Sequence, residues 1–287
     1  MFKKLGQHFL INKSAINKIV SALNLQPDDT VIEIGPGKGA LTFPLIKECE
    51  KIGCKLIAVE KDPQLGLRVE GLGDRKDFKI IIGDALKEIP KITKPYTPNP
   101  IPYKIVGNIP YYITGKLLRL IGELITNYQL PITNIILMVQ KEVAERISVN
   151  PPHNNLLAAA VQFWAEPEIL FTLKPDDFTP QPEVNSAVIK LTTKVVIPTA
   201  EPGSRKENLD SRLRGNDADK TEKYYKLIRI IFKQPRKTIF NNLKTGLKIS
   251  PELIENNLKS LEIDPQSRPQ NLSIEQIKEL VSILKLI

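Results

Sequence analysis

Short apolar runs alternate with amphipathic stretches along the first two thirds of the chain. The apolar runs that we expect to form buried strands are residues 31–34, 55–59, 78–82, 103–106 and 134–139. Strands that alternate with helical stretches are typical of a parallel sheet with crossover helices. Two later runs, residues 169–173 and 184–191, have little helix-like sequence between them, so we expect them to close the sheet edge as an antiparallel pair. The pattern predicts one α/β domain over residues 1–195.

The apolar periodicity disappears after this domain and then returns in helical form. Residues 196–222 are predicted to be a flexible linker or insertion, because they lack any regular apolar spacing. Four helices are predicted beyond it, at residues 224–232, 236–243, 251–261 and 274–286. Ser250 before Pro251, and Ser273 before the last helix, are good helix-start signals. Residues 223–287 are therefore expected to form a small helical domain.

Composition adds limits to this picture. The chain has 287 residues, of which 41% are hydrophobic and 25% are charged, as is usual for a soluble globular protein with an ample core. No stretch approaches the roughly 20 apolar residues that span a bilayer. Residues 1–13 lack the apolar core and cleavage site of a secretory signal. We therefore expect a cytoplasmic location and no membrane partner.

The cysteines and histidines do not suggest a metal site. Cys49 and Cys54 are five positions apart, and the only histidines, His8 and His153, are far from them in the sequence. This spacing does not fit a four-ligand site of the usual Cys/His type. We predict no metal and two reduced cysteines.

The net charge of +9 is concentrated in one segment of the predicted helical domain. Between residues 223 and 248 there are eight basic residues and no acidic one: Lys223, Lys226, Arg229, Lys233, Arg236, Lys237, Lys244 and Lys248. A solvated helix surface usually intersperses acids among its bases. Because acids are absent here, we expect this segment to contact nucleic acid.

A glycine-rich loop follows the first predicted strand. Residues 33–39 read Glu-Ile-Gly-Pro-Gly-Lys-Gly and lead into a helix. Such glycines allow a tight turn and let a ligand approach the backbone closely, as in dinucleotide-binding folds. Glu60 ends the next strand, where a carboxylate can bind both hydroxyls of a ribose. These features fit NAD and S-adenosylmethionine equally well.

The third predicted strand ends at Asp84, whose carboxylate can accept a hydrogen bond from an adenine amino group. The alternative is that Asp84 only caps the helix that follows it. With Gly35 and Glu60 on neighbouring strand ends, an adenosyl pocket is the better interpretation.

Residues 107–112, which follow the fourth strand, read Gly-Asn-Ile-Pro-Tyr-Tyr. The Asn108 side-chain carbonyl can accept one N–H of an exocyclic amine, and the Ile109 carbonyl, held by the fixed φ of Pro110, can accept the other. Such acceptors localise the nitrogen lone pair and make the amine a usable nucleophile, while Tyr111 stacks on the base. A turn in which these residues merely pack is equally consistent with this segment alone.

Together these positions resemble the successive motifs of S-adenosylmethionine-dependent amino methyltransferases. Four further segments narrow the match: residues 6–10, 138–146, 178–186 and 236–238. Over nearly its whole length the chain resembles the ribosomal RNA small-subunit (16S) adenine N6,N6-dimethyltransferases, the bacterial kasugamycin-sensitivity methylases. Residues 198–222 depart from the family pattern, and their composition resembles a mobile repeat inserted into a reading frame.

The resemblance implies a Rossmann-like class I methyltransferase fold, with a mostly parallel seven-stranded sheet and a small C-terminal all-α domain. It implies S-adenosylmethionine contacts at His8, Leu10, Gly35, Glu60, Asp84 and Asn108. His8 replaces the asparagine that is commoner in the family. Its contact with the cofactor is therefore made either by its side chain or by its backbone alone. The resemblance also implies that Asn108 and Tyr111 handle the target adenine and that Phe178 closes its other face, although core packing would explain Phe178 equally well.

The activity implied is transfer of methyl groups to N6 of two adjacent adenosines in a 3′-terminal hairpin of small-subunit ribosomal RNA. The implied partner is the immature 30S subunit, with a role in its biogenesis, and we expect a monomer. The sulfonium is already an activated leaving group, so the displacement needs positioning and no strong base. Three alternatives remain: a large-subunit RNA adenine methylase, an RNA-binding assembly factor and a nicotinamide dehydrogenase.

Overall fold

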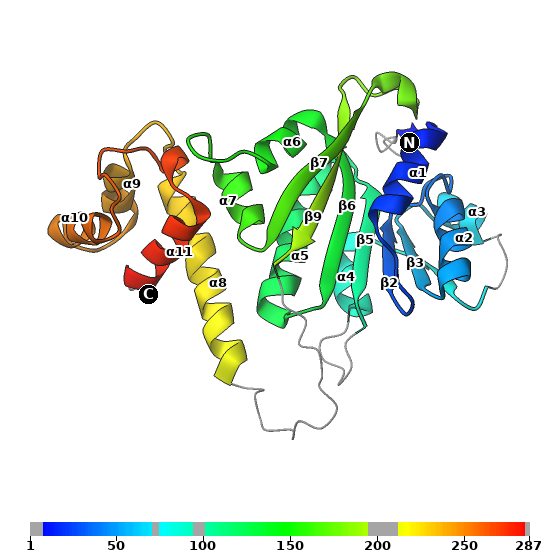
Figure 1. The fold of residues 1–287 in the computed structure, drawn as a ribbon, viewed down its shortest axis with the longest axis horizontal. Coiled ribbons are helices and arrows are strands. Elements are labelled where there is room, and N and C mark those ends of the chain that lie inside the picture. The colour runs from blue at the N-terminus through cyan, green and yellow to red at the C-terminus, as the bar shows by residue number, and fades with distance from the viewer. Residues whose placement is uncertain (1–7, 71–74, 94–100, 195–211, 285–287) are drawn as a thin grey trace. The chain divides into compact units, whose positions relative to one another are not determined.

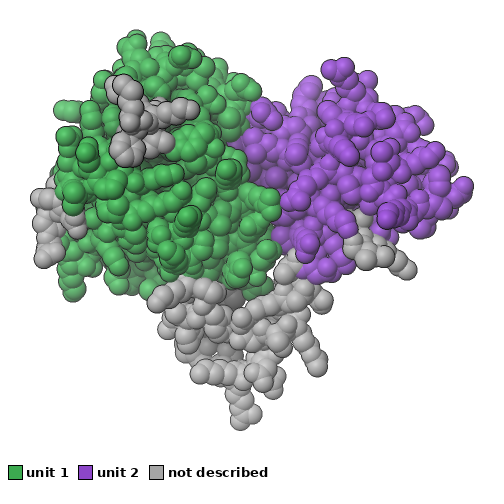
Figure 2. All heavy atoms as spheres, turned by 180° about the vertical axis from the view of Figure 1, so that it is seen from behind, with its two compact units in different colours: residues 1–145, 165–200 green, residues 146–164, 201–287 purple. Residues whose placement is uncertain are grey.

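The computed structural model describes residues 8–70, 75–93, 101–194 and 212–284 (Figure 1). The chain divides into two compact units, coloured separately in Figure 2. Unit 1 comprises Met1–Glu145 and Ala165–Ala200, and unit 2 comprises Arg146–Trp164 and Glu201–Ile287.

Unit 1 is built on a seven-stranded sheet with the strand order β4-β3-β2-β5-β6-β9-β7. Its strands are β2 (Thr30–Ile34), β3 (Lys55–Glu60), β4 (Phe78–Ile82), β5 (Tyr103–Asn108), β6 (Ile132–Gln140), β7 (Ala165–Leu173) and β9 (Ser186–Thr193). Strands β2 to β6 run parallel to one another, and β9 runs antiparallel to both β6 and β7. The predicted fold class, with its antiparallel pair at the sheet edge, is confirmed.

Helices connect the strands of unit 1. They are α1 (Lys13–Ala22), α2 (Thr42–Ile52), α3 (Pro63–Glu70), α4 (Ala85–Ile92), α5 (Thr114–Tyr128) and α6 (Lys141–Ile147). Short 3-10 turns, η1 (Tyr111–Ile113) and η2 (Pro175–Asp177), precede α5 and Phe178. The central strands β2 and β5 carry apolar residues on both faces because helices of a doubly covered parallel sheet bury both faces.

A second, two-stranded sheet was not expected from the sequence. In it β1 (Phe9–Leu10) pairs antiparallel with β8 (Phe178–Thr179), so that Leu10 lies opposite Phe178. Strands of two residues carry no apolar periodicity, and their pairing joins segments more than 160 residues apart. This pairing places the N-terminal segment beside the loop that carries Phe178.

Unit 2 consists of α7 (Leu156–Gln162), α8 (Arg212–Ile231), α9 (Ile239–Gly246), α10 (Pro251–Ser260), η3 (Pro269–Asn271) and α11 (Ile274–Ile283). The predicted helices at 251–261 and 274–286 correspond to α10 and α11, although residues 285–287 lie outside the described residues. Helix α9 begins three residues later than predicted, because Thr238 caps it by accepting from Asn241 N–H.

Two boundaries differ from the expected organisation. Helix α8 begins at Arg212, inside the segment 196–222 that was predicted to be a linker, whereas residues 195–211 lie outside the described residues. Helix α7 belongs to unit 2 and not to the α/β unit. Its Ala159 carbonyl accepts from the hydroxyl of Tyr224 at 2.9 Å, and Phe163 stacks on that ring at 4.0 Å. These contacts bury α7 in the core of unit 2.

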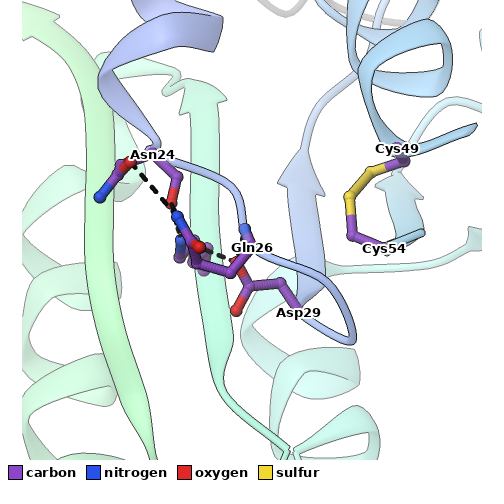
Figure 3. The surroundings of a disulfide bond; sticks show 6 residues. Asn24, Gln26, Asp29, Cys49 and Cys54 are labelled. Atoms are coloured by element: carbon purple, nitrogen blue, oxygen red, sulfur yellow. Dashed lines mark hydrogen bonds and ion pairs between the residues drawn. A yellow bond between two sulfur atoms is a disulfide. The ribbon is translucent and has the colours of Figure 1, made fainter. Parts of the chain in front are cut away.

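The prediction of two reduced cysteines is wrong, because Cys49 and Cys54 form a disulfide (Figure 3). Cys49 lies in the last turns of α2, which ends at Gly53 with φ 90°. This left-handed residue reverses the chain into β3 and brings the two Cα atoms within 4.5 Å. The sequence spacing alone did not reveal that reversal.

Within the described ranges, no helix has both the length and the apolar character that crossing a bilayer requires. The same ranges contain no group of three or more His, Cys, Asp or Glu side chains that could hold a metal ion.

Candidate active site

The carboxyl ends of the parallel strands meet at one edge of the sheet, and a pocket opens there. Among the residues that line it are His8, Gly35, Glu60, Asp84, Asn108, Tyr111 and Phe178. The structure thus brings together every predicted catalytic and cofactor residue except Leu10, which is buried. Leu10 instead pairs through its backbone with Phe178 and joins the apolar core of unit 1.

The glycine-rich loop after β2 forms one wall of the pocket. Gly35 and Gly37 have φ values of 67° and 57°, a region that favours glycine. A Cβ at Gly37 would lie only 2.8 Å from the ring of Phe9. The glycine is therefore needed both for the backbone conformation and for the contact with β1.

Glu60, at the end of β3, is 4% exposed and holds this loop in place. One carboxylate oxygen accepts from Gly37 N–H at 3.0 Å, and the other accepts from Asp62 N–H at 2.9 Å. Each oxygen retains acceptor capacity toward the pocket. Glu60 is therefore fixed in orientation by the backbone around it.

Glu33 lies beneath the same loop and is 1% exposed. Its Oε1 accepts from the hydroxyl of Thr42 at 3.1 Å, while its Oε2 has no hydrogen-bond partner among the described residues. Burial, with a smaller contribution from the charge of Glu60, raises the pKa of Glu33 to about 8, although the bond from Thr42 opposes this. Glu33 is thus a neutral acid at pH 7 that links β2 to the start of α2.

Asp84 caps α4, as one of the two interpretations of the sequence proposed, and it also lines the pocket. Its Oδ1 accepts from Leu86 N–H at 3.0 Å and caps α4, while its Oδ2 lies 3.2 Å from the ammonium of Lys61. Partial burial acts to raise the pKa of Asp84, but the bonds from Leu86 and Lys61 outweigh it and the pKa is lowered. The carboxylate is therefore ionised and remains an acceptor at the pocket wall.

The side chain of Asn108 is oriented by the N-terminal segment. Its Nδ2 donates to the backbone carbonyl of His8 at 2.6 Å. Its Oδ1 has no hydrogen-bond partner among the described residues. Asn108 therefore keeps a free acceptor at the pocket wall, and the role predicted for it requires an acceptor. The His8 ring in turn bonds the Pro180 carbonyl at 2.9 Å through Nδ1.

Tyr111 and Phe178 are the two predicted aromatic site residues, and both line the pocket. The hydroxyl of Tyr111 lies 3.2 Å from the hydroxyl of Ser186, which is 2% exposed. The ring of Tyr111 lies nearly parallel to that of His8, at a centroid distance of 6.3 Å. Phe178 also lines the pocket, but it is 3% exposed and packs in the apolar core, so the core-packing role considered for it is observed.

Sequence reasoning missed two contacts of this site. Lys61, which pairs with Asp84, was not considered. Its position directly after Glu60, at the end of a predicted strand, is the signal that could have identified it as a pocket residue. Ser186 belongs to the segment 178–186 that supported the family resemblance, but the sequence assigned it no role. Only the fold shows that its hydroxyl reaches Tyr111 from the antiparallel strand β9.

The predicted RNA-binding residues all belong to unit 2. Seven are exposed: Lys226, Arg229, Lys233, Arg236, Lys237, Lys244 and Lys248. Lys223 is partly buried and forms an ion pair with Asp219 at 2.8 Å. Arg236 and Lys237 lie in the turn before α9, whose backbone is held by the buried amide of Asn242 through bonds to the carbonyls of Gln234, Lys237 and Thr238.

Comparisons with known proteins agree with one another on the family to which this chain is similar. The model of the family described as ribosomal RNA adenine dimethylase matches residues 2–201. A ribosomal RNA small subunit methyltransferase A of Dehalococcoides mccartyi (strain CBDB1) is 37% identical and covers 97% of this chain and 86% of its own length. The protein of the same name from Fusobacterium nucleatum is 34% identical, covering 99% of this chain and 97% of its own.

Solved structures show the same fold. A dimethyladenosine transferase from Plasmodium falciparum has a TM-score of 0.71 at 22% identity and covers 97% of this chain and 98% of its own. The 23S rRNA methyltransferase ErmE has a TM-score of 0.65 at 23% identity and covers 97% of this chain and 100% of its own.

Proposed function

Because the chain belongs to the ribosomal RNA adenine dimethylase family, we propose that it methylates N6 of two adjacent adenosines in a 3′-terminal hairpin of small-subunit ribosomal RNA. The methyl donor in this proposal is S-adenosylmethionine. The observation that carries the proposal is the orientation of Asn108, whose amide nitrogen is occupied by His8 and whose oxygen is left for an amine.

The pocket residues fit an adenosyl cofactor. Gly35 and Gly37 leave the backbone open to a ligand, the fixed Glu60 carboxylate suits two ribose hydroxyls, and the ionised Asp84 suits an adenine amino group. When bound, the cofactor supplies a methyl group on a positively charged sulfur, which is a good leaving group.

The chain's own residues then have to orient the adenine and prepare its amine. Asn108 Oδ1 and the Ile109 carbonyl accept the two amine hydrogens, which localises the lone pair on N6. Tyr111, fixed by Ser186, stacks on the base, and Phe178 bounds the other side. These acceptors would hold N6 in line with the methyl group that the cofactor would supply, and the proton released from N6 on transfer would pass to solvent. Most of the rate enhancement then comes from position and orientation.

Unit 2 is proposed to supply most of the affinity for RNA. Its exposed cations attract phosphates, and such contacts are independent of base sequence. We propose the immature 30S subunit as the partner, a cytoplasmic location and a monomeric enzyme.

We predict that Asn108→Ala will lower methyl transfer by at least about 100-fold, because the amine loses its acceptor and its alignment. RNA binding should stay near the wild-type level, since the phosphate contacts of unit 2 are untouched. Methyl incorporation into immature small subunits and filter binding of RNA measure the two effects. Equal losses of transfer and binding would show that the motif only binds RNA.

The three alternative functions can be told apart by experiment. A large-subunit methylase would use the same pocket chemistry, so the modified adenosines must be mapped by primer extension on both ribosomal RNAs. An assembly factor without catalysis would bind the subunit and transfer no methyl group. Calorimetry with S-adenosylmethionine against NAD tests the dehydrogenase alternative.

A further inference from the structure

Tyr112 is an aromatic side chain without an assigned role at the rim of the pocket. It lines the pocket beside Tyr111, yet it is 56% exposed, whereas Tyr111 is partly buried and bonded to Ser186. No hydrogen bond to its hydroxyl occurs among the described residues. A large ring held at a pocket mouth in this way has a free face for a ligand.

The surface next to Tyr112 continues along α5. Gly115, Lys116 and Arg119 are exposed in the first two turns of α5, which begins two residues after Tyr112. A Cβ at Gly115 would meet nothing within 4 Å, so the space above it is open. Arg119 is paired with Glu123 at 2.8 Å, whereas Lys116 has no ion pair within the described residues. The chain therefore carries, one after another, the exposed ring of Tyr112, the open surface at Gly115 and the ammonium of Lys116, which has no ion pair within the described residues.

We propose that Tyr112, Gly115 and Lys116 form a subsite for the nucleotide adjacent to the target adenosine. The neighbouring base stacks on Tyr112, its backbone passes over Gly115, and its phosphate contacts Lys116. This inference rests on the proposed function and names a second base-binding position for it.

The chemistry of base extrusion explains why such a subsite is useful. When the target adenine enters the pocket, the neighbouring base loses a stacking partner on one face. An aromatic side chain can replace that partner, and the gain from stacking is largest for purines with extended rings. The subsite would therefore favour a target whose neighbour is itself an adenosine, as two adjacent substrates require.

Tyr112→Ala tests the subsite, with Tyr128→Ala as a matched control. Tyr128 is 57% exposed and is the last residue of α5, which follows Tyr112, and it does not line the pocket. Its substitution therefore removes an equally exposed ring away from the pocket. Methyl transfer is measured on small subunits that carry either the adenosine pair or a uridine in place of one adenosine. We expect Tyr112→Ala to lower kcat/KM about tenfold on the adenosine pair, mainly through KM, and Tyr128→Ala to have no effect.

The remaining variants separate stacking from a structural effect. Tyr112→Phe keeps the ring and should restore wild-type kcat/KM. Wild-type enzyme should lose about tenfold on the uridine substrate, and Tyr112→Ala should lose little more there, because the stacking partner is already weak. Equal losses by Tyr112→Ala on both substrates, or failure of Tyr112→Phe to restore activity, would overturn the subsite. Absence of transfer by the wild-type enzyme would instead refute the proposed function.

Discussion

At the scale of single residues, Glu33 shows how an acidic side chain can be structural beside the glycine-rich loop. It is buried, bonded to Thr42 on one oxygen, and close enough to Glu60 for their charges to interact. A neutral acid avoids placing two carboxylates together beneath the glycine-rich loop. Glu60, held by the N–H groups of Gly37 and Asp62, is then the acidic side chain that faces the pocket.

The raised pKa of Glu33 gives a prediction about stability. The folded protein keeps a proton up to a pH of about 8, whereas the unfolded chain releases it above its ordinary value of 4.5. Between these values folding takes up a proton, so the free energy of unfolding falls as pH rises. Glu33→Gln cannot ionise, and relative to it the wild type should lose on the order of a few kcal/mol between pH 5 and 8.

Urea denaturation of both proteins at several pH values checks this expectation. Glu183→Gln, which removes an exposed carboxyl, is the control and should follow the wild-type pH dependence. Parallel pH profiles for wild type and Glu33→Gln would mean that Glu33 is ionised in the folded protein.

Sequence reasoning at this scale identified residue types better than their orientations. The two roles considered for Asp84 proved compatible, because capping uses one oxygen and leaves the other at the pocket. The orientation of Asn108 was beyond prediction, since it depends on a carbonyl 100 residues earlier in the chain. Contacts of that kind exist only once the fold has brought distant segments together.

At the scale of elements, the junction of β5 with β2 fixes the position of Asn108. Gly107 precedes it in β5, and a Cβ there would lie 2.5 Å from the backbone carbonyl oxygen of Ile34 in β2. Because both atoms belong to the centre of the sheet, neither strand can shift without cost. The glycine therefore allows the close approach that aligns the two motif loops.

We predict that Gly107→Ala will destabilise the protein by about 1–3 kcal/mol and will lower methyl transfer in the fraction that remains folded. Gly115→Ala is the matched control for stability alone, because the added methyl meets nothing within 4 Å and alanine favours a helix. The control should be as stable as the wild type or slightly more stable in urea. If both variants have the same unfolding midpoint, the crowding at Gly107 does not constrain the sheet.

The predictability of the elements followed their periodicity. The long apolar strands and the four C-terminal helices were visible because each repeats a pattern over several residues. The pairing of β1 with β8 and the disulfide between Cys49 and Cys54 carry no such pattern. The start of α8 at Arg212 was also missed, because residues 212–222 lack the apolar spacing of a buried helix face.

At the scale of the whole molecule, the pocket and the cluster of basic residues lie in different units. The pocket belongs entirely to unit 1, whereas the basic residues from Lys223 to Lys248 belong to unit 2. Binding of RNA and transfer of the methyl group should therefore be separable by mutation. Asn108→Ala tests one half of this separation, and charge reversal in unit 2 tests the other.

The second half is tested by reversing Arg236 and Lys237, which are exposed in the turn that Asn242 holds before α9. Each phosphate contact that is lost removes about one unit from the slope of log binding constant against log salt. We expect Arg236→Glu with Lys237→Glu to weaken RNA binding and to flatten that slope by about one to two. Affinity for S-adenosylmethionine should not change.

A control with the same change in net charge separates a local contact from long-range attraction. Lys47→Glu with Lys55→Glu reverses two exposed lysines of unit 1, one on α2 and one at the strand end opposite the pocket. General attraction between a basic protein and RNA would weaken equally in both double variants. A flatter slope only in the unit 2 variant would assign the phosphate contacts to the turn before α9, whereas an unchanged slope there would remove that turn from the RNA interface.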